Sequence, residues 1–317
     1  MQKLKAWITA ARLRTLPLSI AGILIGSVLG SYSKFQLDYL NQKLETPFYS
    51  SPIFWMAIIT TLGLQVLSNF ANDYGDGVKG TDNEDRIGPM RALQSGIITD
   101  SQMKIAIIIT SILTMLSAIY LIYLSFKNTN IGYSLFFFVL GVIAIIAAIK
   151  YTVGTSAYGY KGLGDVFVFI FFGLVSVLGC YFLFQKEVPI IITAPAITIG
   201  CLSTAVLNLN NMRDLHNDAK AGKNTLVVQL GRHKAKLYHY SLLIIAMVSF
   251  LIFYIVTGSK LIELITFLAF IPLLKHLWTV YKIEEPIQFD PELKKVALST
   301  FLLAILFSLS QILTVTL

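Results

Sequence analysis

The sequence predicts an all-α, polytopic membrane protein with nine transmembrane helices. Composition supports this first: of 317 residues, 56% are hydrophobic and 13% are charged, and the mean hydropathy is +0.72. Soluble domains average about 25% charged residues, so this composition is typical of a membrane protein. The spacing of apolar runs and the distribution of basic residues lead to the same fold class.

Apolar runs of about 20 residues, long enough to cross a bilayer, recur along the chain. The first follows Lys3, Lys5 and Arg12 as a signal peptide would, but it has no small-x-small cleavage site, so we interpret it as a helix. With no linker or low-complexity segment, residues 1–317 are expected to form a single transmembrane domain. The nine predicted spans are roughly 15–33, 52–72, 102–125, 132–150, 165–184, 190–210, 237–257, 261–281 and 296–316.

Basic residues predict the orientation of these spans. If the N-terminus is cytoplasmic, 20 of the 25 Lys and Arg residues lie in cytoplasmic segments and 5 lie outside. Short loops with this asymmetry follow the positive-inside rule, so we expect a cytoplasmic N-terminus. The net charge of +8 therefore reflects topology, and we expect no nucleic-acid partner. Carboxylates are not governed by this rule, yet 13 of 17 lie on the cytoplasmic side, which indicates chemistry there.

Two polar clusters end the second and sixth spans. They read Asn69-Phe-Ala-Asn72-Asp73-Tyr-Gly-Asp76 and Asn210-Asn211-Met-Arg213-Asp214-Leu-His-Asn-Asp218. If the helices continue through the clusters, Asn69, Asp73 and Asp76 share one face. Asn210, Asp214 and Asp218 then share a face of the other helix. The loops after the spans are expected at roughly 73–101 and 211–236, and the four-helix offset suggests approximate internal duplication.

Polar groups at the ends of membrane helices are costly to bury and mark an ion, a substrate or a relay. Two acidic faces at one membrane surface repel each other unless a cation lies between them. Carboxylate and amide oxygens suit Mg²⁺, which shares its coordination with substrate phosphates. The clusters therefore predict a diphosphate bridged to both helices by Mg²⁺, with Asn69, Asp73, Asp76, Asp214 and Asp218 as metal ligands. Helix capping explains one such Asp but not two matched sets.

Basic side chains near the clusters are candidates to hold phosphate oxygens. They are Arg86 and Arg91 in the first loop, Arg213 and Lys223 in the second, and Arg14 at the start of the first span. A charge that only sets topology is the alternative for each of them. Asp82, Glu84 and Asp85 are expected on the loop surface, and the four scattered histidines mostly at the membrane interface.

These motifs resemble the UbiA superfamily of intramembrane aromatic prenyltransferases, and the resemblance covers nearly the whole chain. That family carries Asn-Asp-x-x-Asp after its second helix and Asp-x-x-x-Asp after its sixth, in a nine-helix bundle. The general pattern has a further Asp where this chain has Gly80, and the next acid here is Asp82. That departure resembles the branch that prenylates 1,4-dihydroxy-2-naphthoate in menaquinone synthesis. The same branch resembles this chain at Arg12-Leu-Arg14-Thr-Leu-Pro17, Gly88-Pro-Met-Arg91, Tyr151-Thr152, Tyr158-Gly-Tyr160-Lys-Gly-Leu-Gly164-Asp165 and Gly222-Lys223-Asn-Thr-Leu226.

The resemblance implies transfer of a polyprenyl group to the naphthoate, with loss of CO₂ and diphosphate, giving demethylmenaquinol. The implied partners are a polyprenyl diphosphate, an aromatic acid acceptor and membrane lipid, and the implied place is the cytoplasmic side of a bacterial inner membrane. Candidates to flank the acceptor or the allylic cation are Tyr151, Tyr158 and Tyr160. Lys150 or Lys161 is a candidate to pair with the acceptor carboxylate. The candidate catalytic residues are Asp73, Asp76, Asp214, Asp218, Tyr151 and Lys150, and the candidate substrate-binding residues are Arg14, Asn69, Asn72, Arg86, Arg91, Tyr158, Tyr160, Lys161, Asn210, Asn211, Arg213 and Lys223.

Three alternatives remain open from the sequence. The tyrosines also fit an interfacial aromatic belt. The acceptor can be another aromatic acid, such as 4-hydroxybenzoate. A cation-coupled secondary transporter is the alternative of a different class, but transporters usually place such acids near the bilayer midplane on broken helices. Prenyl length and oligomeric state are not set by the sequence.

Overall fold

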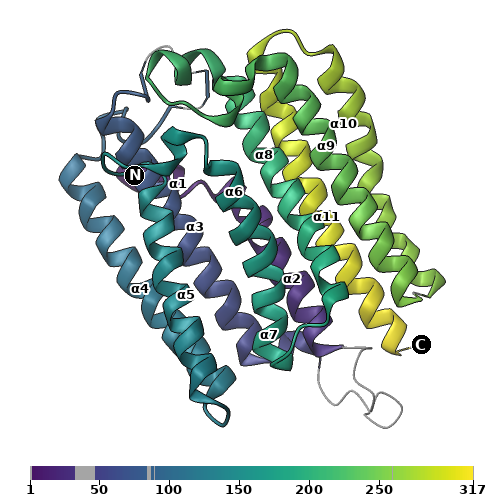
Figure 1. The fold of residues 1–317 in the computed structure, drawn as a ribbon. Helices are drawn as coiled ribbons and strands as arrows, with labels where there is room; N and C mark the ends of the chain where they lie inside the picture. The colour runs from purple at the N-terminus through teal and green to yellow at the C-terminus, as the bar shows by residue number, and fades with distance from the viewer. Residues whose placement is uncertain (1, 33–46, 84–86, 89, 259, 317) are drawn as a thin grey trace.

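The computed structural model describes residues 2–32, 47–83, 87–88, 90–258 and 260–316. Within these ranges nine helical stretches are long and apolar enough to cross a membrane, which confirms the predicted number. Figure 1 shows them packed side by side as one bundle. The helices are α1 (Gln2–Ala11), α2 (Leu16–Ser31), α3 (Pro52–Val78), α4 (Asp100–Phe126), α5 (Ile131–Lys150), α6 (Gly164–Val168), α7 (Cys180–Gln185), α8 (Thr193–Lys220), α9 (Leu226–Thr257), α10 (Ile271–Lys282) and α11 (Phe289–Thr316).

Shorter helical segments complete several spans. A π-helix, Phe169–Gly179, joins α6 to α7, so that the fifth span runs through Gly164–Gln185. A 3-10 helix, Leu261–Phe270, precedes α10 and completes the eighth span. Single 3-10 turns lie at Leu13–Thr15, Phe48–Ser50, Tyr158–Lys161, Ile190–Ile192 and Pro286–Gln288.

Local sequence explains where these helices begin. Ser51 accepts a hydrogen bond from the Ile53 amide at 3.3 Å, and Pro52 follows as the first helical residue of α3. Thr99 and Gln102 form a reciprocal capping box at α4. Thr225 accepts from the Val228 amide at the start of α9. Each cap satisfies backbone amides that the helix itself leaves unpaired.

Both polar clusters are helical, which shortens the loops expected from the sequence. α3 continues to Val78 and α8 to Lys220, and α9 begins at Leu226 rather than near residue 237. The connector between α8 and α9 is therefore 221–225 instead of 211–236. The sequence suggested loops here because these helix ends are rich in Asn and Asp, which are polar but are buried against other elements. The continuation places Asn69, Asp73 and Asp76 on one helical face.

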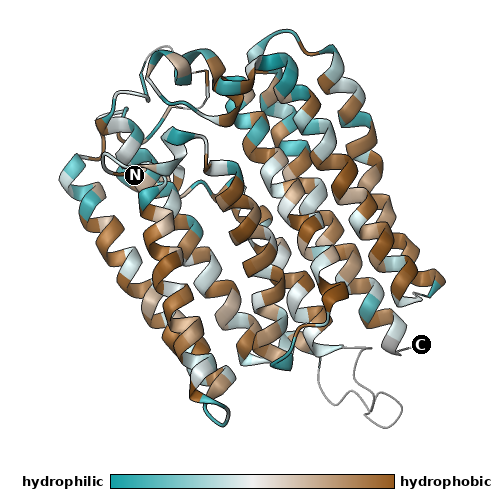
Figure 2. Ribbon diagram, in the orientation of Figure 1, coloured by the Kyte–Doolittle hydropathy of each residue, from teal (hydrophilic) through white to brown (hydrophobic). Residues whose placement is uncertain are grey.

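Apolar side chains cover the outside of the bundle, as expected for a lipid-facing surface. On α4, for example, Ile105, Ile109 and Leu113 are all more than half exposed. Figure 2 shows hydrophobic residues along the middle of the helices and hydrophilic residues gathered at the end that holds α1 and the α8–α9 connector. Inside, glycine permits close helix contact. A Cβ added to Gly26 of α2 would lie 2.6 Å from the Val177 carbonyl oxygen.

A buried polar chain ties the last three spans together. His239 of α9 and His276 of α10 are both 0% exposed, and their Nε2 atoms lie 2.7 Å apart. His276 Nδ1 lies 2.5 Å from the carboxylate of Glu292 in α11. The expectation that the histidines sit at the membrane interface is therefore wrong for these two, because each is paired inside the bundle.

Candidate active site

A cavity of about 390 Å³ lies among α2, α3, α5, the α6–α7 span and α8. Ala57 and Asp76 both line it from α3, and their separation of 19 residues corresponds to about 28 Å along the helix. The cavity therefore runs along most of the bundle. Its polar end is lined by Arg12, Arg14, Asn69, Asn72, Asp76, Arg91, Asn210, Asn211, Arg213 and Lys223, and its apolar length by Ile23, Ala57, Leu121, Ile122, Phe137, Leu140, Ala144 and Leu183.

The first acidic cluster lies at the polar end, on α3. Asp76 accepts a hydrogen bond from the Tyr160 hydroxyl at 2.8 Å, and its carboxylate is 3.3 Å from Lys223 Nζ. Asp73 is 1% exposed and lies behind the cavity lining, where Arg12 Nη2 contacts its Oδ1 at 2.6 Å. Arg91 Nε lies 3.6 Å from the same oxygen. The acids of this helix are thus balanced by cations from three other segments.

Glycine allows a buried threonine to support this wall. A Cβ on Gly75 would lie 2.6 Å from Thr152 Oγ1, so a larger residue would push the two segments apart. Thr152 is 0% exposed and donates to the Ala71 carbonyl at 2.9 Å, with Asn72 Oδ1 at 3.3 Å. The conformation of Asn72, which lines the cavity, is therefore tied to the segment after α5.

The second acidic cluster lies on α8, and Arg213 organises it. Arg213 is 2% exposed and donates to both oxygens of Asp214, from Nε at 2.9 Å and from Nη2 at 2.8 Å. It also donates to Asn210 Oδ1 at 2.8 Å and to Asp290 of α11 at 2.5 Å. Asn210, Asn211 and Arg213 line the cavity, whereas Asp214 lies behind them.

The two clusters lie side by side, and Lys223 joins them. Its Nζ contacts Asp76 of the first cluster, and its backbone amide donates to the Asp218 carbonyl of the second at 2.8 Å. Asn217 Nδ2 also donates to the Thr81 carbonyl at 2.8 Å. Segments more than 130 residues apart in sequence therefore form one polar chamber.

Burial and charge set the protonation of the groups in the loops. Burial opposes the charge of Lys223, but Asp76 and Asp218 raise the pKa of its ammonium above the ordinary value. Burial and nearby Arg12 lower the pKa of Arg91 to about 10, against the attraction of Asp73. Burial raises the pKa of Tyr151 to about 12. At neutral pH, therefore, the chamber presents protonated Lys and Arg beside a neutral phenol.

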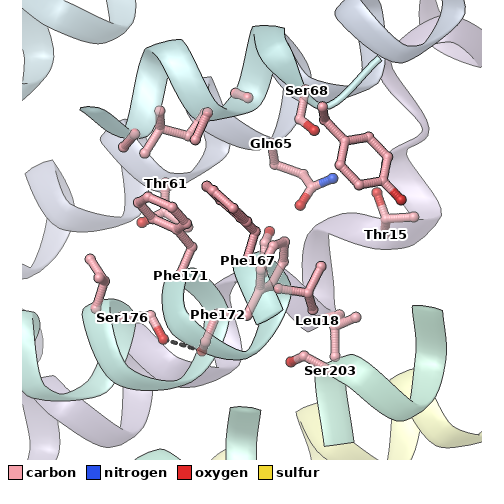
Figure 3. A pocket seen from close by; sticks show the side chains of 18 of the residues that line it. Thr15, Leu18, Thr61, Gln65, Ser68, Phe167, Phe171, Phe172, Ser176 and Ser203 are labelled. Atoms are coloured by element: carbon pink, nitrogen blue, oxygen red, sulfur yellow. Dashed lines mark hydrogen bonds between the residues drawn. The ribbon is translucent and has the colours of Figure 1, made fainter. Parts of the chain in front are cut away.

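Aromatic rings line one side of the same cavity. The Tyr158 ring stacks on Phe167 with centroids 3.9 Å apart, and Tyr151 meets Tyr158 edge-on at 5.4 Å. The Tyr158 hydroxyl donates to the Ala147 carbonyl at 2.9 Å, which fixes its ring. Figure 3 shows Phe167 and Phe171 facing Gln65 and Thr61 across the cavity. The exposed faces of such rings can stack with a planar aromatic ligand.

The structure does not bring every predicted residue to the cavity. Lys150 and Lys161 are exposed and do not line it. Tyr160 does not line the cavity, but its hydroxyl donates to Asp76 and its ring centroid lies 5.4 Å from Lys223 Nζ. Arg86, Glu84 and Asp85 lie outside the described residues. The predicted surface position of Asp82 is wrong: its side chain is 2% exposed and 3.7 Å from Arg91.

Three site residues were given no role by the sequence. Arg12 holds Asp73, and its backbone is left-handed, with φ of 49°. Its position two residues before Arg14 was the available signal. Phe167 gave only a generic apolar signal within a span. Asp290 gave none, because nothing in the sequence links the start of the last span to α8.

The oxygen donors suit Mg²⁺ shared with phosphate. Asp76, Asn69, Asn72, Asn210 and Asn211 all line the polar end. Among the described residues, no three His, Cys, Asp or Glu side chains converge closely enough to hold an ion alone. Magnesium typically takes one or two carboxylates plus substrate phosphates and water. The donor set therefore fits an ion that arrives with a diphosphate.

Comparisons with known proteins agree with this geometry. Residues 39–289 match the model of the UbiA prenyltransferase family. A 1,4-dihydroxy-2-naphthoate octaprenyltransferase of Haemophilus influenzae is 43% identical, covering 97% of this chain and 96% of that protein. The protein of the same name from Escherichia coli is 39% identical, covering 98% and 96%.

Solved structures show the same fold. A UbiA homologue from Archaeoglobus fulgidus aligns with a TM-score of 0.61 at 16% identity, covering 97% of this chain and all of that one. A structure from work on digeranylgeranylglyceryl phosphate synthase aligns with a TM-score of 0.60 at 19% identity, covering 98% and 99%. The matched family model and the full-length relatives together show that the chain belongs to the UbiA prenyltransferase family.

Proposed function

We propose that residues 1–317 act as one transmembrane domain that transfers a polyprenyl group from its diphosphate to 1,4-dihydroxy-2-naphthoate. Diphosphate and CO₂ leave, and the product is demethylmenaquinol. The single observation that carries this proposal is the cavity itself, which joins a charged chamber to an apolar channel beside a group of aromatic rings. Two full-length relatives that bear this activity in their names support it.

The charged chamber binds the diphosphate. Arg14, Arg91 and Lys223 line it and donate to phosphate oxygens, and Arg12 lines it while holding Asp73 in place. Asp76 with the neighbouring Asn side chains would hold Mg²⁺, which supplies charge stabilisation to the departing diphosphate. Asp73, Asp214 and Asp218 lie behind this lining, where we propose that they complete the metal-binding walls. Cations at the developing negative charge favour cleavage of the allylic C–O bond.

The apolar channel holds the prenyl chain and keeps water from the allylic cation. Ile23, Ala57, Leu121 and Leu183 provide no group that could trap a carbocation, and a bound prenyl chain would displace water from this apolar wall. The aromatic faces of Tyr151 and Tyr158 stabilise positive charge at the junction of chamber and channel. The same rings orient the flat acceptor against the cleaving bond.

We further propose that the chamber faces the cytoplasm of a bacterial inner membrane. Lys79, Arg91 and Lys223 lie at the chamber end of the bundle, whereas Lys127 and Lys186 follow helices that end at the other side. This charge asymmetry follows the positive-inside rule. The acceptor and Mg²⁺ then enter from the cytoplasm, and the prenyl chain enters from lipid.

The proposal is tested with purified protein in lipid nanodiscs. The protein is incubated with polyprenyl diphosphates of several lengths and either 1,4-dihydroxy-2-naphthoate or 4-hydroxybenzoate, with Mg²⁺ or with a chelator. We expect a prenylated, decarboxylated naphthalene product by mass spectrometry, together with released diphosphate, only when Mg²⁺ is present. If 4-hydroxybenzoate is prenylated and 1,4-dihydroxy-2-naphthoate is not, the proposed acceptor is wrong. If turnover continues in the presence of the chelator, the proposed Mg²⁺ dependence is wrong.

A further inference from the structure

Arg213 is held from both sides, and one of its partners lies outside the cavity. Within α8 it donates to both oxygens of Asp214. Its Nη1 also donates to Oδ1 of Asp290 on α11, at 2.5 Å. Asp290 does not line the cavity, and its side chain is 37% exposed. It therefore does not contact substrate, yet it fixes the guanidinium that contacts Asp214.

The hydrogen bonds of Arg213 show why both partners matter. Nε and Nη2 form a two-pronged contact with Asp214, and Nη2 also reaches Asn210. A guanidinium is planar, so fixing Nη1 with Asp290 sets the plane in which the other donors point. Because Asp214 accepts two hydrogen bonds from this guanidinium, the plane of the guanidinium also sets the orientation of the Asp214 carboxylate. α11 is held beside the cavity, because Leu293, one turn beyond Asp290, lines it.

Charge gives Asp290 a second effect. Asp214 and Arg213 alone form a neutral pair, whereas Asp214, Arg213 and Asp290 together carry a net charge of −1. Arg213 and Asp214 are buried and weakly screened by solvent, whereas the partly exposed Asp290 is screened more. With Asp290 present, this wall keeps one unit of negative charge to attract a cation at the polar end. Without it, the wall would be neutral and Asp214 would be bound to Arg213 alone.

We propose that Asp290 is a positioning residue for the metal–diphosphate site: it anchors Arg213 and thereby sets the orientation and the available charge of Asp214. The inference rests on the proposed function, in which Asp214 belongs to the wall that binds the metal–diphosphate complex. Groups that contact metal ligands directly typically change metal affinity about 10- to 100-fold when substituted, and Asp290, which acts one contact farther away through Arg213, is expected at the lower end of this range. Loss of Asp290 should therefore weaken the response to Mg²⁺ with little effect on turnover at saturating Mg²⁺.

The test measures thermal unfolding of the purified protein with Mg²⁺ alone, inorganic diphosphate alone, and both together. We expect the wild-type midpoint to rise when both are present. For Asp290→Asn, the Mg²⁺ concentration that gives half of this rise should increase about 10-fold. In turnover assays the KM for Mg²⁺ should rise similarly while kcat at saturating Mg²⁺ stays near the wild-type value. Asp290→Glu should restore most of the Mg²⁺ response.

Asp100→Asn is the matched control, because Asp100 also lies in the first turn of a spanning helix but is exposed and away from the cavity. It should leave the Mg²⁺ response unchanged. If Asp290→Asn is too unstable to purify, Asp290→Ser removes the same charge with a shorter polar side chain. A lowered midpoint with an unchanged Mg²⁺ response in either variant would overturn the inference. If the wild-type protein shows no combined effect of Mg²⁺ and diphosphate, the proposed function itself fails.

Discussion

Lys223 Nζ lies 3.3 Å from Asp76 Oδ2, although the two residues are 147 positions apart in the chain. Asp76 lies in the last turn of α3, and Lys223 lies in the connector 221–225 between α8 and α9. The side chain of Lys223 is 10% exposed and that of Asp76 is 7% exposed. This contact closes the chamber by joining both acidic clusters, so its removal should affect both stability and substrate binding.

Lys223→Met should lower the thermal midpoint at pH 7 and raise the KM for the prenyl diphosphate. Breaking a buried ion pair on one side costs about 3 to 5 kcal/mol. Because the folded pKa of Lys223 is raised, its stabilising charge is present below the unfolded pKa of about 10.4. The difference in midpoint should therefore persist between pH 6 and 9, and shrink only as the pH rises through the folded pKa.

Lys161→Met is the control for this substitution, since Lys161 is an exposed lysine outside the cavity lining. Thermal unfolding followed by intrinsic fluorescence measures both variants. Equal losses in Lys161→Met and Lys223→Met would contradict the role given to the Lys223–Asp76 contact.

Tyr151→Phe should reduce turnover without changing the shape of the pH–rate profile. Burial raises the pKa of the Tyr151 phenol to about 12, so the group stays neutral between pH 6 and 10. It therefore acts through its ring and its hydroxyl, not as a titrating base. Rates measured from pH 6 to 10 check this, and loss of an alkaline limb in the variant would contradict it.

Gly141→Leu should shift the preference of the protein toward shorter prenyl diphosphates. Gly141 lines the apolar channel, and an added Cβ would meet only Ala118 at 3.9 Å, which is ordinary contact. The rest of the leucine side chain then fills channel volume that a long chain would occupy. Product lengths from a mixture of diphosphates measure the shift. Unchanged preference in a folded variant would show that the chain lies elsewhere.

Cysteine labelling can check the orientation. Both native cysteines, Cys180 and Cys201, are buried, so a single exposed cysteine reports its own side of the membrane. Lys234→Cys lies near the chamber end and Lys127→Cys at the opposite end, and both positions are exposed. In intact cells whose outer membrane is permeable, an impermeant maleimide should label position 127 and not 234. The reverse pattern would place the chamber outside.

Helix number and the two clusters follow from local sequence, and the contacts across the bundle do not. Apolar runs of fixed length and i, i+4 spacing are visible in one chain, so nine spans and the shared face of Asn69, Asp73 and Asp76 could be predicted. Asp290 beside Arg213 depends on which helices pack together. The same is true of Thr152 against Gly75, because a close approach leaves only a glycine as its sequence signal.

Charge assignment shows the same limit. Lys150 and Lys161 lie close in sequence to the tyrosines, where a partner of the acceptor carboxylate is expected. Both are nevertheless exposed, and neither lines the cavity. Arg12 resembles a topology-setting charge but contacts Asp73 at 2.6 Å. Whether each of these side chains points into the cavity depends on the direction in which it leaves the backbone. At a break between helices, sequence spacing does not predict that direction.

Diphosphate release by Asp76→Asn and Asp214→Asn, compared with wild type and Asp100→Asn, tests the central claim most directly. Both cluster variants should remain folded and lose about 100-fold or more in rate, a loss of at least about 2.7 kcal/mol in transition-state stabilisation. Asp100→Asn should retain wild-type turnover. Near-normal rates in both cluster variants would contradict a diphosphate site shared by α3 and α8.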